Sequence, residues 1–266
     1  MPTFAANLTF LWTELPFLER FRAAREAGFA HVEYMFPYEH PAAEVYERLD
    51  AAGLEQVLFN LPAGDWAAGD RGIAADPGRV DEFRAGVEQA LAYADTLEVE
   101  QLNCLAGLRL DGVEWQAQWS TLVENVRHAA QRLRAAGRTL LVEPVNTYDV
   151  PGFLVPTTSN ALRLIGEVGE PNVRLQFDAY HVRRMEGDPA TRLRSVLDRT
   201  SHVQIADDPG RHQPGTGAID FGALFALLDD AGYGGAVGLE YVPTPDTAAS
   251  LGWLERFGFA ASERTA

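Results

Sequence analysis

The sequence is poor in cysteine and in positive charge. Its 266 residues include one cysteine, which excludes an intramolecular disulfide framework and any multi-cysteine zinc or iron–sulfur site. Only 22 lysine and arginine residues stand against 38 acidic ones, so the formal net charge is -16. A surface this acidic repels phosphate backbones, and we expect no nucleic-acid partner. A small anionic substrate would need a local basic group or a metal to hold it.

The sequence also has no long apolar run. No stretch of about 18 uncharged apolar residues is present, so we expect no membrane-spanning segment. The first residues carry no basic region ahead of their apolar positions, and Glu14 interrupts the run, which argues against a secretory signal. We therefore expect a cytoplasmic protein.

Short strand-like apolar runs alternate with longer amphipathic helical patterns along the chain. Eight such units of about 33 residues predict an α/β fold, a (β/α)8 TIM barrel, as one domain over residues 1–258 with a frayed tail at 259–266. A doubly wound sheet is the alternative, disfavoured because no strand leads into a G-x-G-x-x-G turn. The expected strands are Phe4–Phe10, His31–Phe36, Leu54–Asn60, Val99–Leu105, Thr139–Val145, Val173–Asp178, Ser201–Ala206 and Ala236–Tyr241.

Polar residues recur on one face of these strands. Successive strand residues point to opposite sides, so parity separates the positions facing the helices from those facing the barrel interior. One parity is apolar and should pack against the outer helices. The other parity ends in a polar residue near the C-terminal end of each strand, where TIM barrels carry catalysis. These residues are Asn7, Glu33, Asn60, Asn103, Glu143, Asp178, Gln204 and Glu240.

Taken singly, each of these polar residues could be a strand end bonded to a neighbouring loop, and this applies to Asn7 and Glu33 in particular. Together at one mouth they would be costly to bury unless they bind something. Glu143, Asp178 and Glu240 would crowd three negative charges, a conflict that a divalent cation removes. Oxygen ligands suit a hard ion such as Mg²⁺ or Mn²⁺, and Gln204 offers a neutral fourth oxygen.

Two more residues of the second half are candidates for binding substrate. His181 follows Asp178 by three residues, where it contacts substrate or caps the turn. Arg211 lies in the glycine-containing loop DDPGRHQPGTG, where it pairs with a substrate carboxylate or simply carries surface charge.

The first half contributes the remaining candidates. Asn60 and Asn103 end their strands at the same rim, as further substrate contacts. The loop LPAGDWAAGDRG brings Trp66 and Arg71 there too, with Trp66 either excluding water or packing on the barrel top. The single thiol, Cys104, has helix-facing parity and is expected to be buried and inert.

Several segments resemble hydroxypyruvate isomerases, within the wider group of xylose-isomerase-like TIM barrels. They are LFNLPAGDWAAGDRGIA (58–74), EPVN (143–146), FDAYH (177–181), HVQIAD (202–207), RHQPGTG (211–217) and GLEY (238–241). The resemblance covers nearly the whole chain. It implies an isomerase that interconverts hydroxypyruvate and tartronate semialdehyde through an enediolate, acting on a small hydroxy-keto acid.

The resemblance also implies roles for individual residues. A metal would be held by Glu143, Asp178, Gln204 and Glu240, with the two glutamates acting as proton donor and acceptor. Gln204 stands where many related epimerases have histidine, which leaves the metal open. A 2-oxo-tetronate isomerase or a ketose 3-epimerase would keep this chemistry with another substrate. A metabolite-binding barrel and an abasic-site DNA repair enzyme are more distant alternatives, and the sequence leaves a homo-oligomer open.

Overall fold

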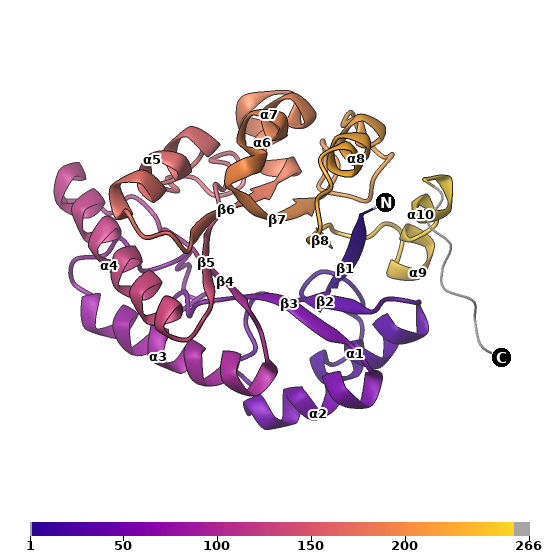
Figure 1. Cartoon of the computed structure of the whole chain (residues 1–266), viewed down its shortest axis with the longest axis horizontal. Helices are drawn as coiled ribbons and strands as arrows, with labels where there is room; N and C mark the ends of the chain where they lie inside the picture. Colours follow the sequence, from indigo (N-terminus) through magenta and orange to yellow (C-terminus); the bar gives the residue numbers. More distant parts are fainter. Residues whose placement is uncertain (1, 258–266) are drawn as a thin grey trace.

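A computed structural model describes residues 2–257 of the chain. Its eight strands pair in parallel, each with the next in sequence, and β1 pairs with β8 to close a barrel. This confirms the expected TIM barrel. Figure 1 shows the ring of strands surrounded by the helices. The strands are β1 (Thr3–Asn7), β2 (His31–Glu33), β3 (Glu55–Asn60), β4 (Gln101–Cys104), β5 (Thr139–Val142), β6 (Val173–Asp178), β7 (Thr200–Ile205) and β8 (Ala236–Leu239).

The connections between strands are helical, as the sequence pattern predicts. Within residues 2–257, no helix combines the length and the apolar character that crossing a membrane requires. The tail expected to fray, 259–266, lies outside the described residues. The helices are α1 (Phe17–Glu26), α2 (Ala42–Ala52), α3 (Val80–Leu97), α4 (Trp115–Ala135), α5 (Thr158–Val168), α6 (Ala179–Glu186), α7 (Pro189–Val196) followed by the 3-10 turn η1 (Leu197–Arg199), α8 (Phe221–Asp230), α9 (Thr247–Ser250) and α10 (Trp253–Arg256).

Several strands end earlier than their apolar runs. The run Phe4–Phe10 gives a strand only to Asn7, because the backbone oxygen of Asn7 accepts from the N–H of Leu11 at 2.9 Å and its side chain accepts from the N–H of Thr9 at 3.0 Å. These bonds turn the chain away from the sheet. β5 likewise stops at Val142, leaving Glu143 on the loop that begins at the rim.

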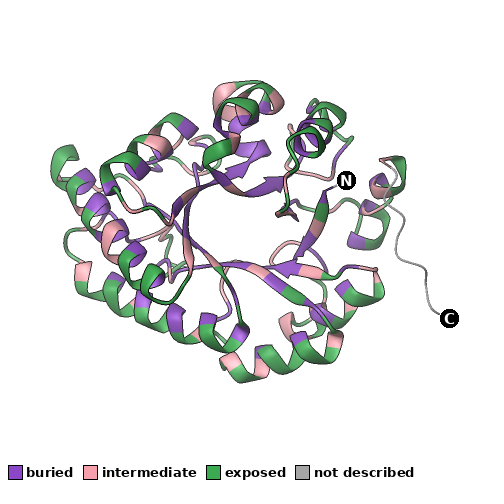
Figure 2. Ribbon diagram, in the orientation of Figure 1, coloured by how far each residue is buried: buried purple, intermediate pink, exposed green. Residues whose placement is uncertain are grey.

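The main hydrophobic core lies between the barrel and its helices, and Figure 2 shows buried residues concentrated on the inner ring. The apolar strand positions expected to face the helices are buried, except Val57, which is half-buried. The buried ones are Val32, Tyr34, Phe59, Val173, Leu175, Phe177, Val203, Ile205, Val237 and Leu239. Tyr34 illustrates the packing, with its ring 5.1 Å from Phe17 and 5.8 Å from Phe21 of α1. Cys104 is buried as expected, and burial raises the pKa of its thiol to about 12.

The barrel interior is polar below its mouth. Glu33 is 1% exposed and accepts from Asn7 Nδ2 and Gln204 Nε2, each at 2.8 Å, while its Oε2 lies 2.6 Å from His202 Nε2. The interpretation of Glu33 as a strand end bonded to a loop is therefore wrong, since its partners stand on β1 and β7. Gly238 on β8 leaves the space that the Glu33 carboxylate occupies, because a Cβ at position 238 would lie 2.3 Å from Glu33 Oε1.

Replacing Gly238 by alanine should destabilise the fold. The added methyl group overlaps the Glu33 carboxylate, which is held by three partners and has no free direction in which to move. Overpacking of this kind costs about 1–3 kcal/mol of unfolding free energy, measurable by denaturant titration. The matched control is Gly166→Ala in α5, where nothing lies within 4 Å of the new Cβ and the helix should gain about 0.5–1 kcal/mol. Equal stability of Gly238→Ala and the wild type would contradict this packing.

Candidate active site

A small cavity opens at the C-terminal ends of the strands, with a volume of about 110 Å³. This is below the 300–1,000 Å³ typical of pockets for drug-sized ligands and suits a molecule of few carbons. Five of the residues expected in the site line it, together with Trp66 and Arg71 from the loop after β3. The five are Asn60, Glu143, His181, Arg211 and Glu240.

Four adjacent strands bring three acidic residues and one glutamine to this mouth. Glu143 follows β5, Asp178 ends β6 and Glu240 follows β8, while Gln204 lies on β7 between them. Asp178 pairs in register with Gln204, and Gln204 with Gly238, so the side chains converge from neighbouring positions. The convergence at the rim follows from parallel pairing and the shared parity of these residues.

Glu143, Asp178 and His181 form a buried group that could hold a metal ion. One potential ligand atom from each lies within 4.8 Å of the others. Asp178 Oδ1 accepts from the N–H of Tyr180 at 2.7 Å, which caps α6. Asp178 Oδ2 is buried and has no hydrogen-bond partner among the described residues. A buried carboxylate oxygen without a donor is the feature expected where a cation binds.

His181 is arranged to donate a hydrogen bond into the cavity. The side-chain oxygen of Asn146 accepts from two backbone N–H groups, which turns its Nδ2 toward His181 Nδ1 at 2.7 Å. Nδ1 therefore accepts, and in the neutral ring the proton sits on Nε2. Nε2 lies 3.8 Å from Glu143 Oε1 and 3.6 Å from Asp178 Oδ2. Burial, with the nearby Arg211 charge, holds the pKa of His181 well below its usual value. This geometry favours a substrate contact over metal ligation.

Arg211 is placed differently from the expectation. Its Nη2 forms an ion pair with Glu240 Oε1 and lies 3.7 Å from Asp178 Oδ2. In this arrangement Nη2 balances the charge of the site's own carboxylates, while Nε has no hydrogen-bond partner among the described residues, and the expected pairing with a substrate carboxylate stays a prediction. The φ of +56° at Arg211, in the left-handed region, belongs to the turn that aims this side chain inward.

Gln204 also departs from its expected arrangement. Its Nε2 donates to Glu33 Oε1 at 2.8 Å and to Glu240 Oε2, while its Oε1 accepts from Gln176 Nε2 at 2.6 Å. Two carboxylates face the amide, so the N–H end rather than the oxygen points to them. The expectation that Gln204 offers an oxygen to the metal is not met here, and ligation would require the amide to turn over.

The two asparagines have unequal positions. Asn103 is fully buried behind the cavity wall and donates from Nδ2 to Glu143 Oε2 at 2.9 Å. It holds a glutamate and is not among the residues that line the cavity, so its expected substrate contact stays a prediction. Asn60 does line the cavity, and its backbone oxygen accepts from the hydroxyl of Tyr38 at 2.6 Å.

The carboxyl groups of the site are electrostatically perturbed. Burial and the neighbouring Asp178 raise the pKa of Glu143 to about 8. Burial also raises the pKa of Glu240 well above its usual value, against the opposing effect of Arg211. The pKa of Asp178 is raised by burial too. Carboxyl groups with raised pKa values in a cavity are typical of general acid–base sites.

Several residues of the site were missed in the sequence. Asn146 orients His181, and Asp149 accepts from Asn146 Nδ2 at 3.0 Å and from the Tyr180 hydroxyl at 2.7 Å. The only signal for Asn146 was its place in EPVN, three residues after Glu143. The apolar wall of the cavity comes from loops without a periodic pattern and includes Phe10, Met35, Leu105, Val145, Val150 and Phe153.

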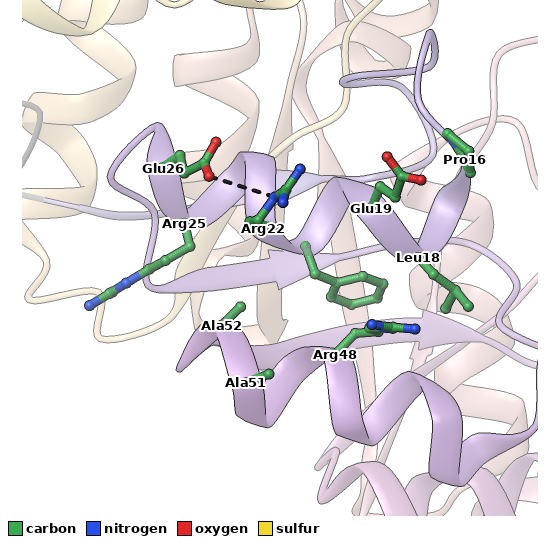
Figure 3. A pocket seen from close by; sticks show the side chains of 10 residues that line it. Pro16, Leu18, Glu19, Arg22, Arg25, Glu26, Arg48, Ala51 and Ala52 are labelled. Atoms are coloured by element: carbon green, nitrogen blue, oxygen red, sulfur yellow. Dashed lines mark ion pairs between the residues drawn. The ribbon is translucent and has the colours of Figure 1, made fainter.

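A larger hollow of about 870 Å³ lies between α1 and α2, away from the barrel mouth. Figure 3 shows Arg22, Arg25 and Arg48 around it, with Arg22 ion-paired to Glu26 at 3.6 Å. It contains none of the residues expected in the site. The small cavity, not this hollow, unites the candidate groups.

The fold and the site together define a TIM barrel with an acidic centre at the C-terminal ends of β5 to β8. Residues 21–257 match the xylose isomerase-like TIM barrel family, and the chain belongs to it.

Within this family, the chain is similar to individual proteins that are named as isomerases. The chain is 45% identical to the hydroxypyruvate isomerase of Escherichia coli strain K12, covering 97% of this chain and 100% of that protein. It is 44% identical to a 2-oxo-tetronate isomerase of Cupriavidus necator, covering 97% and 99%. A crystal structure titled AP endonuclease, family 2, from Brucella melitensis superposes with a TM-score of 0.93 at 44% identity, covering 97% and 99%. The relatives confirm the resemblance seen in the sequence and the expected isomerase class.

Proposed function

We propose that this chain interconverts hydroxypyruvate and tartronate semialdehyde (2-hydroxy-3-oxopropanoate), moving a proton between adjacent carbons of a short 2-oxo acid. The observation that carries this proposal is a pair of buried glutamates, Glu143 and Glu240, lining one small cavity. The similarity to the E. coli protein named hydroxypyruvate isomerase supports this substrate. The C. necator relative supports a 2-oxo-tetronate as the second candidate, with the same chemistry on a longer acid.

The reaction needs one group that accepts a proton and one that donates it. Because burial raises the pKa of both glutamates, one of the pair can keep its proton near neutral pH while the other is ionised. The ionised glutamate takes a proton from the hydroxyl-bearing carbon, which gives an enediolate. The protonated glutamate delivers a proton to the neighbouring carbon. The proton of the original hydroxyl passes to the former carbonyl oxygen, so the atoms balance.

His181 and Asn103 support this exchange in the proposal. The Nε2–H of His181 donates to a substrate oxygen, where negative charge develops in the enediolate. Asn103 fixes the Glu143 carboxylate by its bond to Oε2. General acid–base catalysis of this kind contributes about 10² to 10⁴ in rate.

The donor set also supports a divalent metal, Mg²⁺ or Mn²⁺. Glu143 and Asp178, each with a carboxylate oxygen within 4.8 Å of the other, would hold it, and Asp178 Oδ2, which has no hydrogen-bond partner among the described residues, is the clearest fit. Glu240 would join by exchanging its present bonds with Arg211 and Gln204 for the metal, and Gln204 after its amide turns over. When bound, the metal supplies polarisation of the carbonyl and charge stabilisation of the enediolate. All-oxygen donors favour these hard ions over softer ones.

The other functions raised by the sequence have less support. The cavity of about 110 Å³ leaves little room for a ketose, and the net charge of -16 opposes binding of DNA. A non-catalytic barrel would not need two carboxyl groups with raised pKa values facing one cavity. The cytoplasmic location and the homo-oligomer stay predictions.

Proton exchange with solvent is the direct test. Metal-loaded protein turning over hydroxypyruvate in heavy water should place solvent deuterium on the carbon that receives the proton, because a carboxyl group exchanges with water between turnovers. Mass spectrometry or NMR of the product measures this. Complete retention of the substrate's own hydrogen at normal turnover would contradict transfer through the glutamates.

Removing either carboxylate should stop catalysis. Glu143→Gln and Glu240→Gln should each lower kcat by about 10²-fold or more, since each loses one half of the proton transfer. Rates are measured at saturating Mg²⁺ or Mn²⁺, with bound metal determined by elemental analysis. Glu124→Gln on the exposed side of α4 is the matched control and should keep full activity. Wild-type rates in a metal-loaded glutamine variant would remove that glutamate from the mechanism.

Metal binding should stabilise the folded protein. After EDTA treatment, added Mg²⁺ or Mn²⁺ should raise Tm, by the equivalent of about 2.7 kcal/mol at a hundredfold excess over Kd. Asp178→Asn should lose most of this shift, because the amide offers a weaker ligand than the carboxylate. Asp230→Asn, at the exposed end of α8, should keep it. An unchanged shift in Asp178→Asn would place the cation elsewhere.

A further inference from the structure

Two guanidinium groups line the cavity, and they differ in their partners. Arg211 is engaged by Glu240. Arg71 forms no ion pair with any carboxylate in residues 2–257, and its Nη1 donates only to the backbone oxygens of Trp66 at 3.1 Å and Asp70 at 2.6 Å. In a chain of net charge -16, an arginine left without a carboxylate beside an acidic cavity is available to bind an anion.

Stacking fixes the plane of the Arg71 side chain. Its Cζ lies 4.1 Å from the ring centroid of Trp66, and the Trp66 ring packs 5.2 Å from that of Phe36. A guanidinium held by its face keeps its edge free for planar, bidentate pairing with a carboxylate. Of the three guanidinium nitrogens of Arg71, only Nη1 has hydrogen-bond partners among the described residues. Nε and Nη2 are therefore available to such a ligand.

The loop that carries Arg71, residues 61–79 between β3 and α3, is held firmly against the barrel. Its Asp70 carboxylate pairs with Arg79 Nη1 at 2.7 Å. Gly72 has a φ of +107° and lies so close to the end of β4 that a Cβ would stand 2.3 Å from the Leu105 backbone oxygen. Arg71 sits between these two anchors, which places it before any ligand arrives and lowers the entropic cost of binding.

The charges of the cavity then orient a 2-oxo acid. A substrate carboxylate is repelled by Glu143 and Glu240 and attracted by Arg71. With the carboxylate directed to Arg71, the oxo and hydroxyl carbons extend toward the two glutamates. A neutral ketose gains nothing from this contact.

We propose that Arg71 binds the substrate carboxylate and so makes the site selective for 2-oxo acids over neutral hydroxyketones. The proposal rests on the proposed function, because the substrate it orients is the one isomerised by Glu143 and Glu240. It assigns Arg71 the carboxylate-binding role that the sequence suggested for Arg211.

The first experiment compares hydroxypyruvate with 1,3-dihydroxyacetone, in which a hydroxymethyl group replaces the carboxylate. Arg71→Gln should lower kcat/KM for hydroxypyruvate by about 10- to 100-fold, mainly by raising KM, since one charged, bidentate contact is lost. The same variant should change kcat/KM for dihydroxyacetone by less than about threefold. Arg71→Lys should recover part of the loss, as a charge without the planar fork.

A matched control separates local from global charge effects. Arg48→Gln removes the same charge from the exposed hollow between α1 and α2 (Figure 3) and should leave both substrates unaffected. Equal losses for hydroxypyruvate and dihydroxyacetone in Arg71→Gln would show a role in closing or shaping the cavity and overturn the proposal. An unchanged KM for hydroxypyruvate would also overturn it.

Binding of pyruvate tests Arg71 without turnover. Pyruvate has the carboxylate and the oxo group but no hydroxyl group, so it cannot be isomerised. Calorimetry on the metal-loaded protein should give a Kd about 10-fold or more weaker in Arg71→Gln than in wild type. If wild type isomerises no 2-oxo acid, the proposed function fails, while a weaker pyruvate Kd in the variant still supports Arg71 as an anion-binding residue. The same pyruvate Kd in both proteins rejects it.

Discussion

The crowding of buried carboxylates at the barrel mouth is the constraint on which the rest of the site depends. Glu143, Asp178 and Glu240 are each at most 6% exposed, so each loses hydration and repels the others. Hydrogen-bond donors offset part of this cost. Arg211 pairs with Glu240, and side-chain amide N–H groups donate to Glu143 and Glu240. Asp178 Oδ2 has no hydrogen-bond partner among the described residues and lies 3.6 Å from His181 Nε2 and 3.7 Å from Arg211 Nη2, which is the arrangement expected where a cation binds.

Buried carboxylates also need hydrogen-bond donors deeper in the barrel, and these bonds connect the site to the fold. Gln204 bonds Glu240 at the mouth and Glu33 below it, so one side chain of β7 fixes both acidic layers. Glu33 in turn occupies the volume that Gly238 leaves empty on β8. The loss of one bond in a polar interior of this kind weakens the bonds of its neighbours as well. Changes at Gly238 should therefore reach Glu240 through Glu33 and Gln204.

The sequence could predict the ring of strands and the polar rim because strand parity has a period of two and parallel strands end at one edge. It could not predict which end of an amide faces a neighbour. The oxygen and nitrogen of Gln204 or Asn103 occupy the same shape, and only the surrounding acceptors decide between them. The pairing of Arg211 with Glu240 could not be predicted for a related reason, since a loop residue with φ of +56° takes its direction from the turn and not from a periodic pattern.

Chemistry and recognition come from separate parts of the chain. The glutamates proposed to transfer the proton stand at the ends of β5 and β8, whereas Arg71 lies in the loop after β3, held by Trp66 and the barrel edge. Hydroxypyruvate and a 2-oxo-tetronate share the carboxylate next to the oxo group and differ only at the far end of the chain. An arginine that binds the shared carboxylate is therefore compatible with either substrate named in the relatives, hydroxypyruvate or a 2-oxo-tetronate. Discrimination between the two acids would then depend on other residues that line the cavity, whose apolar members include Val150 and Phe153.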